Sequence, residues 1–148
     1  MKKKIVILTP TVFICLFSLI VTLGLLSSYL GYKDLLSAKK KLGSADVTSA
    51  VSSAQAAYNK FGLAKTTLSL LRPNFVLIGK EKEVGELEVF LTSGQDIAQG
   101  TILVGKAAMS LQDTIFSVWS GKGYDVSEVR SAQMHLTHAK TYFSHATS

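Results

Sequence analysis

Residues 47–71 read VTSAVSSAQAAYNKFGLAKTTLSLL, and their apolar and small side chains recur at alternating steps of three and four residues. This spacing lines one face of a helix, as in helices that pack in bundles. The same steps run through residues 129–146 and through residues 87–118, where they fall on Leu87, Phe90, Gly94, Ile97, Thr101, Val104, Ala108, Leu111, Ile115 and Val118. The sequence therefore predicts an all-α fold, an antiparallel bundle of long, Ala-rich helices.

Turn residues set the expected ends of these helices. Gly43 follows a helix that continues from the N-terminal segment, and the Arg72-Pro73 pair ends the next one, because proline disfavours helical geometry in the residue before it. The Gly-Lys-Gly sequence at residues 121–123 ends the longest helix. The predicted bundle helices are therefore residues 31–42, 46–71, 81–119 and 126–146.

Polar residues near the expected helix starts can cap them. Ser44 or Asp46 can accept hydrogen bonds from the free N–H groups of the second bundle helix. Asp125 and Glu128 have the spacing of a capping box, with aspartate in place of serine or threonine, and open the last helix. At the end of the long helix, we expect Trp119 to cover the end of the bundle; an exposed anchor for a partner is the alternative.

Many positions on the predicted packing faces are alanine or glycine. Small residues let helix axes approach to the lower end of the usual ~8 to 10 Å, while Phe61, Phe90, Leu111 and Phe143 fill the spaces between. A thin Ala-rich core leaves little volume for a ligand. We therefore expect no bound cofactor.

The N-terminal segment is the most apolar part of the chain. Residues 5–30 contain 26 residues without a charged side chain, and Lys2, Lys3 and Lys4 precede them. About 20 such residues cross a ~30 Å hydrocarbon core. A cleavable signal peptide has a shorter apolar core of ~7 to 15 residues and a small-residue cleavage site, which does not follow this run closely. The sequence predicts an uncleaved transmembrane helix over residues 5–30.

Clustered lysines favour one orientation of this helix in the cell membrane. Positive residues flank both ends, but those at residues 1–4 are packed tightly against the apolar run, which favours a cytoplasmic tail there. Residues 31–148 are then extracytoplasmic. Cys15 lies within the expected span, so the exported part has no cysteine for a disulfide.

The formal net charge of +6 belongs to the first half of the chain. Residues 31–71 carry six lysines and two aspartates, whereas residues 72–148 carry seven positive and eight negative side chains. Without an arginine cluster or interleaved aromatic residues, this distribution argues against nucleic acid as a partner. It favours contact with anionic headgroups of the lipid bilayer.

An apolar turn follows the second bundle helix. If the preceding helix descends to the membrane, this turn can dip into the headgroup interface with two cationic side chains at lipid phosphates. A loop packed under the end of the bundle is the alternative, and both interpretations stay open. The predicted membrane-interface residues are Lys65, Arg72, Phe75, Val76, Leu77 and Ile78.

The remaining polar residues indicate no catalytic site. His135, His138 and His145 are spaced along one helix, but no cysteine or nearby carboxylate joins them, and a metal needs three or four converging ligands. The alternating charges of residues 80–88 suit a solvated helix start. No nucleophile elbow, phosphate-binding loop or dinucleotide pattern occurs. We expect neither an enzyme nor a metal site.

The order of these segments resembles a known family. A lysine-led anchor precedes DLLSAKKKLG at residues 34–43, an Ala-rich helix opens on Asp46, a break spans residues 73–79, and a last helix follows a long one. This order is similar to the N-terminal region of bacterial membrane-anchored proteins that carry domain of unknown function 4012. In that family a larger extracytoplasmic domain follows, so the resemblance implies a fragment or a truncated relative. It suggests roles at the envelope or with extracellular polysaccharide and assigns no functional residue.

These observations predict a single-pass membrane protein with an extracytoplasmic bundle. Its expected function is structural: a spacer, or a module that binds a protein partner or a following domain at the cell envelope. The alternative is the ligand-sensing bundle of a receptor-like protein, truncated before its second span. A second span would need a later uncharged run of membrane-crossing length, and residues 97–105 are far too short.

Overall fold

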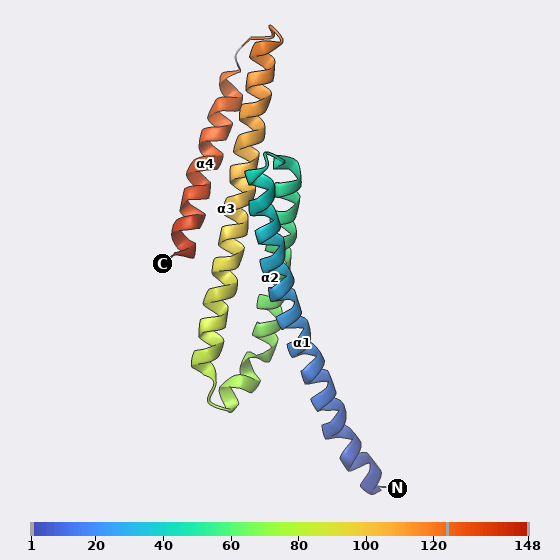
Figure 1. Ribbon diagram of the computed structural model, residues 1–148. Helices are drawn as coiled ribbons and strands as arrows, with labels where there is room; N and C mark the ends of the chain where they lie inside the picture. Colours follow the sequence, from blue (N-terminus) through green and yellow to red (C-terminus); the bar gives the residue numbers. More distant parts are fainter. Residues whose placement is uncertain (1, 124, 148) are drawn as a thin grey trace.

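The computed structural model describes residues 2–123 and 125–147, with side chains for residues 12, 15–123 and 125–147. All regular secondary structure in this part of the chain is helical, which confirms the predicted fold class. Consecutive helices run in opposite directions (Figure 1). The helices are α1 (Lys2–Gly43), α2 (Val47–Leu77), α3 (Glu81–Trp119) and α4 (Val126–Ala146).

The first helix is continuous from the apolar segment into the bundle. No break separates the predicted span from the predicted helix over residues 31–42, as expected. Within the described residues, Cys15–Gly43 is long and apolar enough to cross a membrane, by length and composition. The N-terminal part of α1 projects past the turn between α2 and α3 (Figure 1).

The second helix begins where the sequence predicts and ends later. Asp46 caps it by accepting a hydrogen bond from the Ser49 N–H at 3.2 Å. The prediction that it ends at Arg72-Pro73 is wrong, because Pro73 lies inside α2, which continues to Leu77. Pro73 has no N–H to donate to the preceding turn, so α2 continues through it with one backbone hydrogen bond fewer.

The end of α2 is closed by a short turn with a left-handed residue. The N–H of Lys80 donates to the Phe75 carbonyl at 2.9 Å, and the N–H of Gly79 donates to the Val76 carbonyl at 3.0 Å. Gly79 has φ +72°, a conformation that glycine adopts without the clash a Cβ would bring. This closure supplies partners for carbonyls at the helix end.

The third helix is the spine of the fold and has two packing faces. Leu91 and Ala98 pack with α2 residues in one core cluster, and Ile102 packs with Ala38 of α1 and Ala54 of α2 in a second. A second face of α3 carries another set of buried residues, and Phe143 of α4 lies against one of them, Gly100. This set consists of Gly100, Leu103, Ala107 and Thr114.

The predicted single packing face of α3 is therefore wrong over much of its length. Five of its members are exposed: Leu87, Phe90, Leu111, Ile115 and Val118. One continuous row of residues cannot face two partner helices on different sides of α3. In contrast, the predicted face of α2 is confirmed, and its buried members are Ala50, Ala54, Ala57, Phe61, Ala64 and Leu71.

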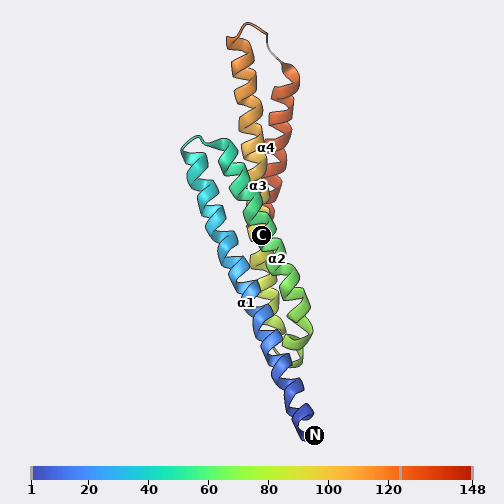
Figure 2. The same cartoon turned by 90° about the vertical axis from the view of Figure 1, so that its right-hand side faces the viewer.

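The fourth helix packs on α3 and on no other helix of the described residues. Together the distal part of α3 and α4 form a hairpin that extends beyond the turn between α1 and α2 (Figure 2). At its tip, Trp119 is 89% exposed, so the expectation that it covers the end of the bundle is wrong. Asp125 opens α4 by accepting from the Ser127 N–H at 2.8 Å.

Candidate functional site

One face of α1 remains exposed although it is apolar. Only 11% of its most apolar window is buried, whereas a core helix of a soluble protein is mostly buried. The outward side chains include Leu16, Leu19, Leu23, Leu26 and Tyr29. This helix therefore needs either an apolar medium or a partner on its outer face.

The opposite face of α1 carries small residues that let α2 approach. A Cβ built on Gly24 would lie 3.1 Å from the Cγ2 of Thr67, and one on Gly31 would lie 3.3 Å from the Phe61 ring. Ser27 and Ala38 are buried on the same face. These residues are spaced three, four and seven apart, and that spacing is the signal of helix contact that the sequence interpretation of residues 5–30 missed.

Aromatic contact holds the end of α2 against α1. The rings of Phe17 and Phe75 have centroids 6.1 Å apart and are tilted by 50°. Phe17 belongs to the predicted membrane span, and Phe75 belongs to the predicted membrane interface. The structure therefore places a residue of the predicted span in contact with a residue of the predicted interface.

An apolar cleft opens between α1, α2 and α3 at this end of the molecule. Its volume is about 270 Å³. It was not expected, because a thin Ala-rich core leaves little room. Leu87 and Phe90 of α3 line the cleft without filling it. Its walls include Val21 and Leu25 of α1, Leu71 and Phe75 of α2, and Leu87 and Phe90 of α3.

The two hydroxyl groups in the cleft wall are already engaged. The Ser28 hydroxyl donates to the Gly24 carbonyl at 2.9 Å, and the Thr67 hydroxyl donates to the Leu63 carbonyl at 2.9 Å. No charged side chain lines the cleft. The wall therefore offers hydrocarbon surface and no uncommitted donor.

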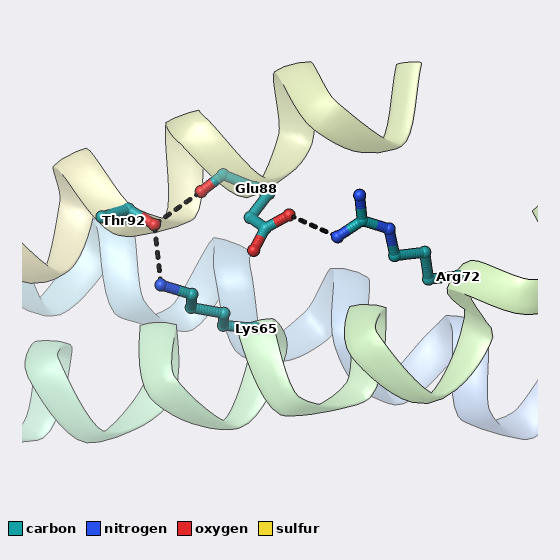
Figure 3. A network of polar contacts seen from close by, with 4 residues as sticks. All are labelled: Lys65, Arg72, Glu88 and Thr92. Carbon is teal, nitrogen blue, oxygen red and sulfur yellow. Dashed lines mark hydrogen bonds and ion pairs between the residues drawn. The ribbon is translucent and has the colours of Figure 1, made fainter. Parts of the chain in front are cut away.

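Two of the predicted interface residues bridge α2 to α3 (Figure 3). The Lys65 ammonium donates to the Thr92 hydroxyl at 2.9 Å, and the Arg72 guanidinium pairs with Glu88 at 3.3 Å. The Thr92 hydroxyl in turn donates to the Glu88 carbonyl at 2.8 Å. We call this group the α2–α3 polar strap. In Figure 3, α1 lies behind it, so the strap and α1 flank opposite faces of the α2–α3 pair.

The other predicted interface residues divide at the helix end. Phe75 packs on α1, whereas Leu77 is 84% exposed and Ile78 is 68% exposed. Val76 is exposed as well. The structure thus brings the apolar side chains of residues 75–78 together at the tip of the α2–α3 hairpin. It places Lys65 and Arg72 along the side of this helix pair. Insertion of the tip into a membrane stays a prediction.

Charged residues follow the tip directly. Lys80 and Glu83 form an ion pair with nitrogen and oxygen 2.5 Å apart. Their hydrogen bond raises the pKa of Lys80 above its usual value and lowers the pKa of Glu83. Both side chains are solvent-exposed, so the pair is screened by water and adds little to stability.

Among the described residues, no group of three or more His, Cys, Asp and Glu side chains could hold a metal ion.

No family model matches the chain, and comparisons with curated protein sequences and with solved structures give no significant match. The resemblance to proteins with domain of unknown function 4012 therefore stays a prediction. The features of the structure that bear on function are the exposed apolar face of α1, the cleft and the tip of the α2–α3 hairpin.

Proposed function

We propose that the chain is a single-pass, N-terminally anchored membrane protein whose remaining helices form an extracytoplasmic spacer or interaction module at the cell envelope. The exposed apolar face of α1 carries this proposal. A helix whose most apolar window is only 11% buried is stable when lipid covers its outer face. The helical rod formed by α3 and α4 then extends away from the anchor.

The register between the helices limits where the bilayer lies. Because Phe75 contacts Phe17, the tip of the α2–α3 hairpin is level with that part of α1. Phe17 precedes Leu30 by 13 residues, or about 20 Å along a helix. A hydrocarbon boundary at Leu30 would therefore bury the charged start of α3 in lipid, which is costly.

A span shifted toward the N-terminus reduces this conflict. About 20 residues cross the hydrocarbon core, so a span of about residues 3–22 suffices. Leu16 and Leu19 of the exposed α1 face lie within it, and Leu23, Leu26 and Tyr29 lie at or above its outer boundary. Phe17 and Phe75 then lie about five residues, or ~8 Å, inside the outer boundary, and Leu77 and Ile78 lie up to ~4 Å deeper. Interfacial segments reach depths of ~5 to 10 Å. Leu77 and Ile78 are immersed at this depth. The charged side chains that follow them, residues 80–83, must extend toward the headgroups, and the pairing of Lys80 with Glu83 reduces the cost.

Topology labelling tests the anchoring. With Cys15 replaced by serine, single cysteines are placed by Lys3→Cys and, at the distal tip, by Lys122→Cys. In intact spheroplasts of a bacterial host, a membrane-impermeant maleimide should label residue 122 at once and residue 3 only after the membrane is opened. Recovery of the chain in the soluble fraction, or equal labelling of both positions, would overturn the proposal.

A ligand-sensing bundle is the second candidate function, and the cleft is the observation that favours it. An occupant would contact three helices together and would stabilise one arrangement of them. Thermal unfolding of the full chain in detergent, with and without added amphiphiles, tests this function. A higher midpoint with one amphiphile supports sensing, and an unchanged midpoint with all of them contradicts it.

A further inference from the structure

We propose that the cleft between α1, α2 and α3 holds one acyl chain of a membrane phospholipid. This inference rests on the membrane anchoring proposed above and goes further, because it assigns a ligand class to a defined cavity. Four properties of the cleft support it: its position, its chemistry, its size and its exposed rim.

The position of the cleft makes it continuous with the bilayer. One wall is formed by α1, with Val21 at the upper end of the proposed span and Leu25 just above its outer boundary. Phe75, which contacts Phe17, forms the lower end of the cleft. With the span at about residues 3–22, this lower end lies below the outer hydrocarbon boundary. An acyl chain therefore enters from the lipid without crossing water.

The chemistry of the wall selects hydrocarbon over polar ligands. The hydroxyls of Ser28 and Thr67 donate to carbonyls of their own helices and have no further hydrogen to offer. A ligand with buried polar groups would leave those groups unpaired, which is unfavourable. An acyl chain has no such groups.

The size and shape of the cleft suit a single chain. At about 270 Å³ it is below the ~300 Å³ at which ordinary small-molecule sites begin. It runs along α1 from Val21 to Ser28, a helical length of about 11 Å. An apolar space of this volume and length can hold part of one linear acyl chain.

The rim of the cleft carries apolar side chains that have no cover. Leu25 is 64% exposed, Phe90 is 54% exposed, and Leu87 is also exposed. An acyl chain lying between them removes this surface from water and contacts all three helices. No other described segment of the chain covers these side chains.

The headgroup has little part in the proposed recognition. The nearest cationic side chains on α2, Lys65 and Arg72, belong to the α2–α3 polar strap, which faces away from α1 (Figure 3). Binding should therefore be similar for zwitterionic and anionic phospholipids with the same chains. This independence separates acyl-chain binding from the electrostatic attraction of a basic surface.

Photo-crosslinking of the full chain in phosphatidylcholine vesicles tests the proposal. A small fraction of the phosphatidylcholine carries a diazirine within one acyl chain, and mass spectrometry maps the adducts after irradiation. We expect adducts on the outer face of α1, at Leu19 and Leu23, and also on the α2 and α3 walls, at Leu71 and Phe90. Replacing the probe by its phosphatidylglycerol analogue should leave this pattern unchanged.

Two neighbouring residues provide a matched pair of variants. Leu25→Trp places a large side chain in the cleft and should abolish most adducts on the α2 and α3 walls. Leu26→Trp makes the same change on the outer face of α1 at almost the same depth, and should leave those adducts unchanged. If circular dichroism shows that Leu25→Trp does not fold, Leu87→Trp fills the cleft from α3 instead.

The possible failures of the two proposals are distinguishable. Adducts on Leu19 and Leu23 without any on the α2 and α3 walls would overturn the acyl-chain site and leave the anchoring intact. Wall adducts that persist equally in the cleft-filling variants would also overturn the site. The absence of adducts from α1 altogether would overturn the anchoring and, with it, this inference.

Discussion

The Phe61 ring of α2 lies directly against Gly94 of α3. A Cβ built on Gly94 would lie 2.8 Å from Cε1 of that ring, closer than such atoms approach in proteins. Phe61 is 1% exposed, and its other side meets Gly31 of α1. One aromatic ring thus sits between two glycines and fixes the spacing of three helices.

This contact predicts a large difference between two glycine variants of α3. Gly94→Ala should be less stable than Gly85→Ala by about 1 to 3 kcal/mol, because the added methyl overpacks the Phe61 ring. Gly85 has open space at its Cβ position and lies within the helix, so alanine there should raise stability by ~0.5 to 1 kcal/mol. Urea unfolding in detergent micelles measures both. Equal stability of the variants would contradict the close packing.

A second prediction concerns the small residues where α1, α2 and α3 meet. Ala54 is fully buried and packs with Ala38 and Ile102. Ala54→Leu should cost about 1 to 3 kcal/mol by forcing these helices apart. The neighbouring change Gln55→Leu, at an exposed position of α2, is the control and should leave the unfolding midpoint nearly unchanged. A wild-type midpoint for Ala54→Leu would show that the helices are not closely packed there.

The cap of α4 predicts a pH-dependent signal. Hydrogen bonds from the Ser127 side chain and backbone N–H lower the pKa of Asp125. The cap is fully formed above the ordinary aspartate value of ~3.9 and is lost as the pH falls through the lower folded-state pKa. The amide NMR shift of Ser127 should therefore titrate with a midpoint below that value. Asp125→Asn should remove the titration, and a midpoint at or above the ordinary value would contradict the hydrogen bonds.

The tip of the α2–α3 hairpin predicts depth-dependent fluorescence quenching. A fluorophore attached through Val76→Cys, in a chain with Cys15→Ser, should be quenched by lipids brominated high on the acyl chain. The same label at Lys122→Cys, on the distal tip, should not be quenched. The two single-cysteine variants are compared in vesicles of the same composition, so the difference between them reports the depth of the labelled site. Absence of quenching at residue 76 would favour a tip that stays in water.

The helices could be predicted from sequence because each carries a local periodic signal. The bounds of α3 and α4 match the predicted residues 81–119 and 126–146. Pro73 misled the prediction for α2, since the structure keeps a proline within the last turns and closes the helix at Gly79. The rule that proline disfavours helical geometry in the preceding residue considers only the local sequence. It takes no account of the contact between Phe75 and Phe17, which holds the last turn of α2 against α1.

The cleft could not be predicted because it depends on the register between helices. Val21, Leu71 and Phe90 are far apart in sequence, and each alone is an ordinary apolar position. The residues that line the cleft are brought together by the packing of α1 on α2, which is close at Gly24 and Gly31, and of α3 beside them. For the same reason, the two packing faces of α3 were merged into one predicted row.

Since α4 packs on α3 alone among the described helices, this part of the chain has two halves that share one helix. The proximal half, with α1 and α2, contains the cleft and the anchor, whereas the distal half is a two-helix hairpin. Separation of α4 from α3 breaks no contact of the proximal half. The two halves can therefore form separate cooperative units. Released from α3, α4 would also leave a vacant binding surface for the α4 of another molecule, and helix exchange is a simple route from one chain to a dimer.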